Sequence, residues 1–185
     1  MVRDSAATKA RILEAATAEF AAAGLAGARV DRIAERAGAN KQLIYAYFGS
    51  KERLFDTTIE TQLGRVLDAV PFDAKDLPGY AVRFYDLLTA DPTLLRLWRW
   101  QALERPGALA RVPQAVESTV AKLGALAEAQ AAGVLDTGLP PEGLLDVLLA
   151  LILGAADGGA DGVHGLCGDL RGALAHTVRR LVEPR

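Results

Sequence analysis

The segment from residue 29 to residue 55, RVDRIAERAGANKQLIYAYFGSKERLF, constrains the fold of this chain more than any other. It holds two short helical patterns joined by a turn that contains a glycine. Ala34, Gly38 and Ile44 stand at positions i, i+4 and i+10. A small residue lets the second helix approach the first, the glycine can take the left-handed conformation that ends the first helix, and the isoleucine packs the second helix back. The spacing predicts a helix-turn-helix over about residues 29–48, a unit that places its second helix in the major groove of DNA.

The remainder of the chain is expected to be helical as well, because no segment shows the sustained polar–apolar alternation of a strand. Asp4 or Ser5 is expected to cap the first helix at its N-terminus, and Gly24 to close it. Residues 71–79 are expected to form a loop, and the glycine-rich stretch 154–168 a loop or a broken helix. The expected helices cover about residues 6–23, 30–37, 40–48, 50–70, 80–90, 92–105, 113–132, 140–153 and 169–182.

The composition agrees with an all-α fold. The chain has 185 residues, of which 51% are hydrophobic and only 6% are aromatic, so it can bury a core in which alanine and leucine favour helices over strands. We expect a three-helix DNA-binding domain over residues 1–50. Residues 51–185 are expected to form a larger helical bundle for regulation and dimerisation, which gives about nine helices in total.

Charge is distributed unevenly along the chain. Residues 1–55 hold nine basic and six acidic residues, whereas residues 56–185 hold 12 basic and 17 acidic ones. The first part therefore carries a formal charge of +3 and the second part −5, within the net −2 of the whole chain. A basic head on an acidic body suits a protein whose head meets the phosphates of double-stranded DNA.

Side chains suited to catalysis are scarce. The chain has two histidines and one cysteine, Cys167, so a catalytic triad or a zinc site has little material and no disulfide can form within the chain. Residues 1–10 carry no apolar run that would mark a secretory signal. The longest apolar stretch, 144–153, is interrupted by Asp146 and is too short to span a membrane. We therefore expect a cytoplasmic protein with no cofactor, no membrane contact and no enzymatic activity.

The start of the predicted recognition helix carries the polar groups that would read DNA. Asn40 is placed to cap this helix, whose N-terminus can itself hold a phosphate. Lys41 and Gln42 lie in the first turn, which enters the groove most deeply. Lysine can donate to guanine O6 and N7 or to a phosphate, and glutamine suits adenine N6 and N7. We expect all three residues to contact DNA, with a bland solvated surface as the competing interpretation of Lys41 and Gln42.

Further contacts are expected along the same helix and just beyond it. Tyr45, Ala46 and Tyr47 are assigned to the DNA surface, and a packed aromatic cluster with Phe48 is the competing interpretation of the tyrosines. Lys51 begins the next helix, where the helix dipole makes a cation costly. A nearby phosphate would offset that cost, so Lys51 is interpreted as a clamp on the DNA backbone.

The stretch from about residue 9 to residue 55 resembles the DNA-binding region of the TetR family of transcriptional repressors. The assignments above agree with what this resemblance implies, position by position, for YAYFGSKERL. Arg29 departs from the family pattern, because threonine or serine usually stands there, caps the second helix and contacts phosphate. Arginine cannot cap, so either Gly27 or Ala28 begins that helix less tightly, or Arg29 reaches the phosphate itself. We favour the latter.

The resemblance also implies functions for the body of the chain. The last two helices would form a four-helix interface in a homodimer that reads a palindromic operator. Residues 144–153 are apolar around nearly the whole helix, so they must be buried on more than one side, with completion of the subunit's own core as the alternative. The expected interface residues are Leu145, Leu148, Leu149, Ile152, Leu174 and Val178.

A repressor of this family would be released from DNA by a small molecule, here expected to be lipophilic. Trp98 and Trp100 stand two residues apart and point about 200° apart on a helix, so both cannot face one pocket and one belongs to the core or an interface. The expected pocket residues are Phe84, Leu88, Trp98, Trp100 and Gln101.

Two alternatives remain open at this point. A DNA-binding regulator could use its body only to dimerise, without a small ligand. A metal-responsive regulator could use the loop 157–169, which holds Asp157, Asp161, His164, Cys167 and Asp169, although their spacing matches neither a calcium loop nor a zinc motif.

Overall fold

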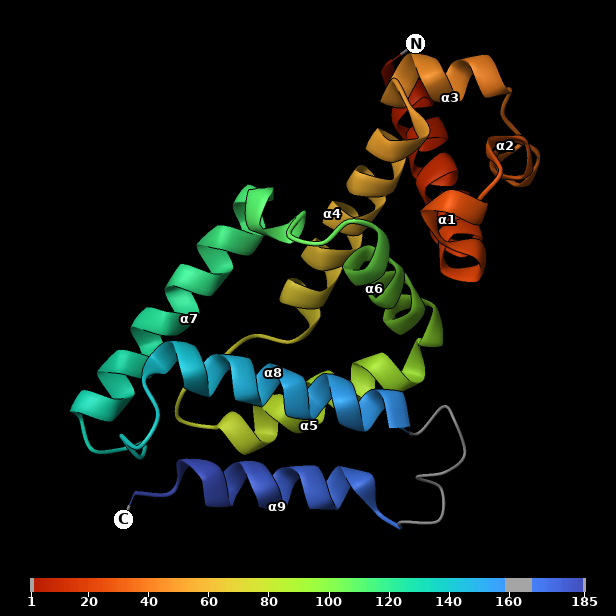
Figure 1. The fold of residues 1–185 in the computed structure, drawn as a ribbon. Helices are drawn as coiled ribbons and strands as arrows, with labels where there is room; N and C mark the ends of the chain where they lie inside the picture. The colour runs from red at the N-terminus through yellow and green to blue at the C-terminus, as the bar shows by residue number, and fades with distance from the viewer. Residues whose placement is uncertain (1, 159–167, 185) are drawn as a thin grey trace. The chain divides into compact units, whose positions relative to one another are not determined.

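A computed structural model describes residues 2–158 and 168–184 of the chain (Figure 1). The described residues form nine α-helices, one short 3₁₀-helix and no strand, which confirms the predicted all-α class. The elements are α1 (Val2–Gly27), α2 (Val30–Ala37), α3 (Lys41–Phe48), α4 (Lys51–Ala69), α5 (Leu77–Ala90), α6 (Pro92–Glu104), η1 (Leu109–Arg111), α7 (Pro113–Ala131), α8 (Pro141–Gly158) and α9 (Leu170–Val182).

Three helix boundaries differ from the sequence-based expectation. α1 begins at Val2, so Asp4 and Ser5 lie inside the helix and not at its N-cap position. α5 begins within the expected loop, because Asp76 caps it by accepting the backbone N–H of Gly79 at 2.9 Å. α8 continues to Gly158, so the first residues of the glycine-rich stretch are helical. Isolated glycines weaken a helix without ending it when its apolar face is buried.

The described chain divides into two compact units. Unit 1 comprises residues 1–65 and 92–112, and unit 2 comprises residues 66–91 and 113–185. α6 therefore belongs to the same unit as the N-terminal helices, although about 40 residues separate it from α3 in the sequence. The functional division at residue 50 remains a prediction, and the compact units do not follow it.

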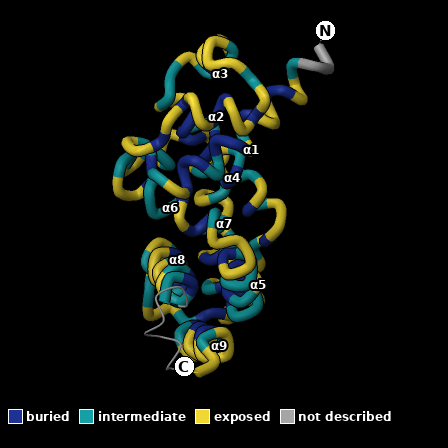
Figure 2. The backbone as a smooth tube through the Cα atoms, turned by 90° about the vertical axis from the view of Figure 1, so that its right-hand side faces the viewer, coloured by how far each residue is buried: buried dark blue, intermediate teal, exposed yellow. Residues whose placement is uncertain are grey.

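Unit 1 is built around one apolar core (Figure 2). The rings of Phe20 on α1 and Phe55 on α4 meet edge to face, with their centroids 5.0 Å apart. Ile33 on α2, Ile44 on α3 and Leu97 on α6 are buried in the same cluster. Each fully buried aliphatic side chain of this size contributes about 1.5–3 kcal/mol. The core therefore joins the three N-terminal helices to both α4 and α6.

α6 closes unit 1 by packing against the end of α1. Gly24 breaks α1 with φ 69° and ψ −177°, as expected of a closing glycine, and a further turn follows it. The indole of Trp100 lies against Gly24 and donates its Nε1–H to the carbonyl oxygen of Ala21 at 3.3 Å. The carboxylate of Glu104 accepts the backbone N–H groups of Leu25 and Ala26, the latter at 3.1 Å. Two side chains of α6 thus fix the last turn of α1.

Unit 2 holds a second core in which α5 contacts both α8 and α9. Leu88 on α5, Leu148 on α8 and Val178 on α9 have no exposed surface. Tyr80 on α5 is also buried, and its ring meets Phe72 edge to face at 5.0 Å between centroids. Among the described residues, no helix is both long enough and apolar enough to cross a membrane.

Candidate DNA-binding site

The turn between α2 and α3 has the geometry that the sequence predicts. Gly38 adopts the left-handed conformation with φ 57° and ψ 39°. The backbone N–H groups of Gly38 and Ala39 return to the carbonyl oxygens of Glu35, at 3.1 Å, and Ala34, at 2.9 Å. Ala34 and Ile44 are both buried where the two helices meet. The roles predicted for Ala34, Gly38 and Ile44 in the helix-turn-helix are confirmed.

Asn40 caps α3, as predicted. Its backbone is extended, with φ −97° and ψ 156°, and its side-chain Oδ1 accepts the backbone N–H of Leu43 at 2.7 Å. The cap satisfies only one of the N–H groups that a helix leaves without an internal partner in its first turn. α3 therefore begins with a fixed geometry, and the positive end of its dipole remains suited to a phosphate.

The surface of α3 presents four of the predicted DNA-contacting residues. Lys41, Gln42, Tyr45 and Ala46 are all exposed. The ammonium of Lys41 lies 3.0 Å from the carboxylate of Asp31 on α2, and this hydrogen bond and charge raise the pKa of Lys41 above its ordinary value. Lys41 thus stays a cation at any physiological pH, and the two exposed side chains can separate when a stronger anion approaches.

Tyr47 belongs in part to a packed cluster. It is half-buried, and its ring meets that of Phe48 edge to face with 6.4 Å between centroids. The ammonium of Lys9 lies over the ring of Tyr47, 5.1 Å from its centroid. This cation–π contact places a basic group of α1 beside the recognition helix. Packing and a hydroxyl contact to phosphate are compatible in a tyrosine.

Lys51 lies at the first position of α4 and makes a contact that the sequence did not suggest. Its ammonium donates to the carbonyl oxygens of Ala26, at 3.3 Å, and Ala28, at 3.2 Å. These carbonyls follow the kink at the end of α1 and offset the cost of a cation at a helix N-terminus. An ammonium has three N–H donors, so one remains for the predicted phosphate contact.

Arg29 occupies the N-cap position of α2 but does not cap it with its side chain. Its backbone N–H donates to Oε1 of Glu19 on α1 at 3.0 Å, and this buried carboxylate also lies 3.8 Å from the guanidinium of Arg32. The side chain of Arg29 is exposed. The start of α2 is thus held by Glu19, which leaves the guanidinium of Arg29 available at the surface.

Comparison with known proteins places this geometry in a family. The family model of bacterial regulatory proteins, tetR family, matches residues 12–58. The model of the tetracyclin repressor-like C-terminal domain matches residues 76–180. The chain belongs to the TetR family.

Two relatives from Streptomyces coelicolor support this assignment over almost the whole TetR-family chain. The HTH-type transcriptional repressor SCO4008 is 40% identical over 195 residues, covering 98% of each protein. The crystal structure of the putative transcriptional regulator SCO4942 is 35% identical, covers 95% of this chain and 98% of that chain, and superposes with a TM-score of 0.83. The regulator FadR from Bacillus subtilis, solved with stearoyl-CoA, shares the fold at 20% identity with a TM-score of 0.67, covering 92% of this chain and 95% of that chain.

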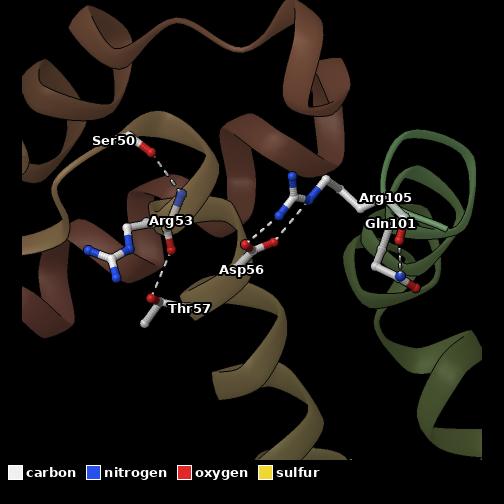
Figure 3. A network of polar contacts seen from close by, with 6 residues as sticks. All are labelled: Ser50, Arg53, Asp56, Thr57, Gln101 and Arg105. Atoms are coloured by element: carbon white, nitrogen blue, oxygen red, sulfur yellow. Dashed lines mark hydrogen bonds and ion pairs between the residues drawn. The ribbon is translucent and has the colours of Figure 1, made fainter. Parts of the chain in front are cut away.

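The predicted ligand-pocket residues of this TetR-family chain fall into both units. Phe84 and Leu88 are buried in unit 2, whereas Trp98, Trp100 and Gln101 belong to α6 in unit 1. Trp100 packs on α1, as expected for one of the two tryptophans. Gln101 is buried, and its Nε2 donates to the carbonyl oxygen of Arg105 at 2.9 Å (Figure 3).

A pocket of about 310 Å³ lies beside Gln101, between α4 and the end of α6. Gln101 is the member of the predicted set that lines it. The other lining residues are Asp56, Ile59, Glu60, Arg105, Ala108, Leu109, Arg111 and Val112. Sequence reasoning missed these residues because they come from α4, from η1 and from the segments on either side of η1, and share no local pattern.

The predicted dimer-interface residues lie mainly inside unit 2. Five of the six are buried in the single chain, and Leu149 is half-buried. Their side chains complete the subunit's own core against α5, which is the alternative stated for them above. The buried five are Leu145, Leu148, Ile152, Leu174 and Val178. The exposed residues of α8 are Glu142, Asp146, Val147, Ala150 and Gly154.

The metal-sensing alternative gains no support. Asp157 is in α8, and Asp169 caps α9 by accepting the backbone N–H of Gly172 at 2.9 Å. Asp161, His164 and Cys167 lie outside the described residues. Within residues 2–158 and 168–184, no three His, Cys, Asp or Glu side chains come together as metal ligands would.

Proposed function

We propose that this TetR-family chain is a transcriptional repressor that binds a palindromic operator as a homodimer and leaves it when a small molecule binds its regulatory domain. The observation that carries the proposal is the exposed surface of α3 on a helix-turn-helix with complete turn and cap geometry. The name of SCO4008, a repressor 40% identical to this chain over 98% of its length, supports the same function.

In the proposed complex, the first turn of α3 reads the bases. Lys41 leaves Asp31 and donates to guanine or to a phosphate, while Gln42 pairs with adenine. Tyr45 and Ala46 lie farther along the exposed surface and contact the groove wall. Each well-formed contact to a base edge discriminates against the wrong base by about 1–3 kcal/mol.

The DNA backbone is held by residues around the recognition helix. Asn40 and the N-terminus of α3 take one phosphate, and Arg29, Tyr47 and Lys51 take others. Lys51 keeps its two contacts to α1 and uses its remaining N–H for the phosphate. This arrangement would orient the module without reading sequence.

Dimerisation is proposed to use the exposed surfaces of α8 and α9. Val147, Ala150 and Gly154 recur at i, i+3 and i+7 on α8, and Ala173 and Thr177 at i and i+4 on α9. Small residues on one face let two helices approach closely, and a self-complementary patch generates a two-fold dimer. Such a dimer would present its two recognition helices to half-sites about 34–36 Å apart.

The release step would couple a ligand in the regulatory part, residues 51–185, to the separation of the two heads. A ligand that binds one head geometry better than the other shifts the population toward it. The expected lipophilic ligand would use the apolar side chains around Phe84 and Leu88 in unit 2, both of which are buried.

The test selects DNA fragments bound by the purified protein from a random library and then measures their binding by gel shift. We expect a palindromic site, and we expect Gln42→Ala to weaken and broaden its recognition. Gln114→Ala, at an exposed position at the start of α7, is the matched control and should bind as the wild type does. Failure to enrich any sequence, or an unchanged preference in Gln42→Ala, would contradict the proposal.

A further inference from the structure

The pocket between α4 and α6 is called the α4–α6 pocket here, and all the residues that line it belong to unit 1. Its volume of about 310 Å³ is at the lower end of the range for ligand sites, so it suits a small molecule. Ile59 and Val112 are buried and supply apolar walls, and Gln101 adds a buried amide. The pocket is therefore lined by the mixture of apolar and few polar groups that ligand sites use.

The acidic and the basic side chains that line the α4–α6 pocket come from different parts of unit 1. Asp56 and Glu60 stand one helical turn apart on α4 and form an acidic side. Arg105, just after α6, and Arg111, in η1, form a basic side. The four lining charges sum to zero, with the two signs contributed by different elements.

One ion pair joins the two sides. The guanidinium of Arg105 donates from Nε to Oδ1 of Asp56 at 3.2 Å and from Nη2 to Oδ2 at 2.6 Å (Figure 3). Only 30% and 36% of these two side chains is exposed. Glu60 and Arg111 are exposed and make no ion pair with the described residues. The pocket thus offers one acid and one base that are free, beside an acid and a base that are paired.

We infer that the α4–α6 pocket binds a small zwitterion, a molecule with a separate ammonium and carboxylate such as an amino acid. Its ammonium pairs with Asp56 and Glu60, and its carboxylate pairs with Arg105 and Arg111. A ligand with a single charge that entered between Asp56 and Arg105 would leave one of them half-buried and unpaired, which is costly. A zwitterion supplies a new partner to both Asp56 and Arg105, so neither charge is left unpaired.

We expect this exchange of ion-pair partners to affect the DNA-binding surface, and this part of the inference rests on the proposed function. Arg105 directly follows Glu104, whose carboxylate holds the last turn of α1. That turn supplies the carbonyl oxygens that bind Lys51, at the start of α4. Parting Asp56 from Arg105 frees α4 to shift against α6, and the zwitterion thereby changes the position of the recognition helix.

The experiment titrates the full-length protein with the standard L-amino acids and with straight-chain ω-amino acids, using calorimetry. Each zwitterion is compared with the carboxylic acid and the amine of matching length. We expect at least one zwitterion to bind about tenfold or more tightly than both of its singly charged analogues. A panel in which no zwitterion binds, or in which the singly charged analogues bind equally well, would overturn the inference.

Variants locate the site. Glu60→Gln and Arg111→Gln change exposed side chains that make no ion pair within the described part of the chain, so they preserve the fold and should each weaken zwitterion binding by about tenfold. Arg171→Gln, which breaks the exposed bidentate pair with Asp86 in unit 2, is the matched control and should bind normally. Unchanged binding in both pocket variants would place the zwitterion elsewhere and refute the assignment.

Gel shifts keep this inference distinct from the proposed function. If the protein binds its selected operator and no zwitterion binds the protein, only the inference fails. If the protein enriches no operator, the proposed function fails, whatever calorimetry reports. If a zwitterion binds the pocket and leaves operator affinity unchanged, the coupling through Arg105 is refuted.

Discussion

Replacement of Gly24 by alanine tests how α6 fixes the end of α1. The φ of 69° with ψ of −177° lies in a region that essentially only glycine enters, so a side chain there costs about 1–3 kcal/mol in backbone strain. An added Cβ would also lie 2.7 Å from Cε3 and 2.9 Å from Cδ2 of Trp100, so the indole must shift. Overpacking of this kind costs about 1–3 kcal/mol. We expect Gly24→Ala to lower the free energy of unfolding by about 2–6 kcal/mol.

Urea denaturation of variants at two other glycines separates the backbone strain at Gly24 from the steric contact with Trp100. Gly38 has φ 57° and no atom within 4 Å of an added Cβ, so Gly38→Ala should cost only the left-handed conformation, about 1–2 kcal/mol. Gly124 lies inside α7 with open space around it, and Gly124→Ala should stabilise by about 0.5–1 kcal/mol. A loss in Gly24→Ala no larger than that in Gly38→Ala would refute the contact argument. Trp100→Leu should reduce the difference, because it removes the ring that Cβ would meet.

Further predictions concern four other positions. Lys51→Met should cost about 1–2 kcal/mol in urea unfolding, because the carbonyls of the α1 end lose a charged donor, while Lys75→Met, exposed in the loop before α5, should be neutral. Burial raises the pKa of Tyr80 to about 12, so the unfolded chain loses this proton at lower pH than the folded one. The free energy of unfolding should therefore fall by about 2–3 kcal/mol as the pH rises from about 10 to about 12, and Tyr80→Phe should remove that fall. Leu148→Arg places a charge at a fully buried site and should unfold the protein, as measured by circular dichroism. Val147→Arg should leave a folded monomer, as measured by sedimentation. A folded Leu148→Arg dimer or a normal Val147→Arg dimer would contradict these assignments.

Local patterns made the helix-turn-helix predictable. Gly38 must end α2 and Asn40 must cap α3 because each role depends on the conformation or side chain of one residue within a few positions. The contacts of Trp100 and Glu104 with α1 span 78 or 79 residues and leave no periodic signal, so the place of α6 in unit 1 was missed. The charged side chains of the α4–α6 pocket were missed for the same reason.

The apolar sequence of α8 predicted that this helix is buried, but not which chain covers it. A helix with leucine around most of its circumference must be buried on several sides, and this expectation agrees with the structure. Hydrophobicity does not specify whether the covering surface comes from the same chain or from a second copy. Leu148 is covered by its own subunit, and a residue beside it, Val147, is left at the surface.

Unit 1 is built from two separate segments of the chain, and this limits how the chain can fold during synthesis and how its parts can be exchanged between proteins. Its second segment, residues 92–112, emerges from the ribosome only after residues 66–91, which belong to unit 2. The N-terminal helices must therefore wait for Leu97, Trp100 and Glu104 before their core and the end of α1 are complete. A fragment cut after α4 would expose that apolar surface, so an exchange of regulatory parts between such proteins requires three junctions rather than one.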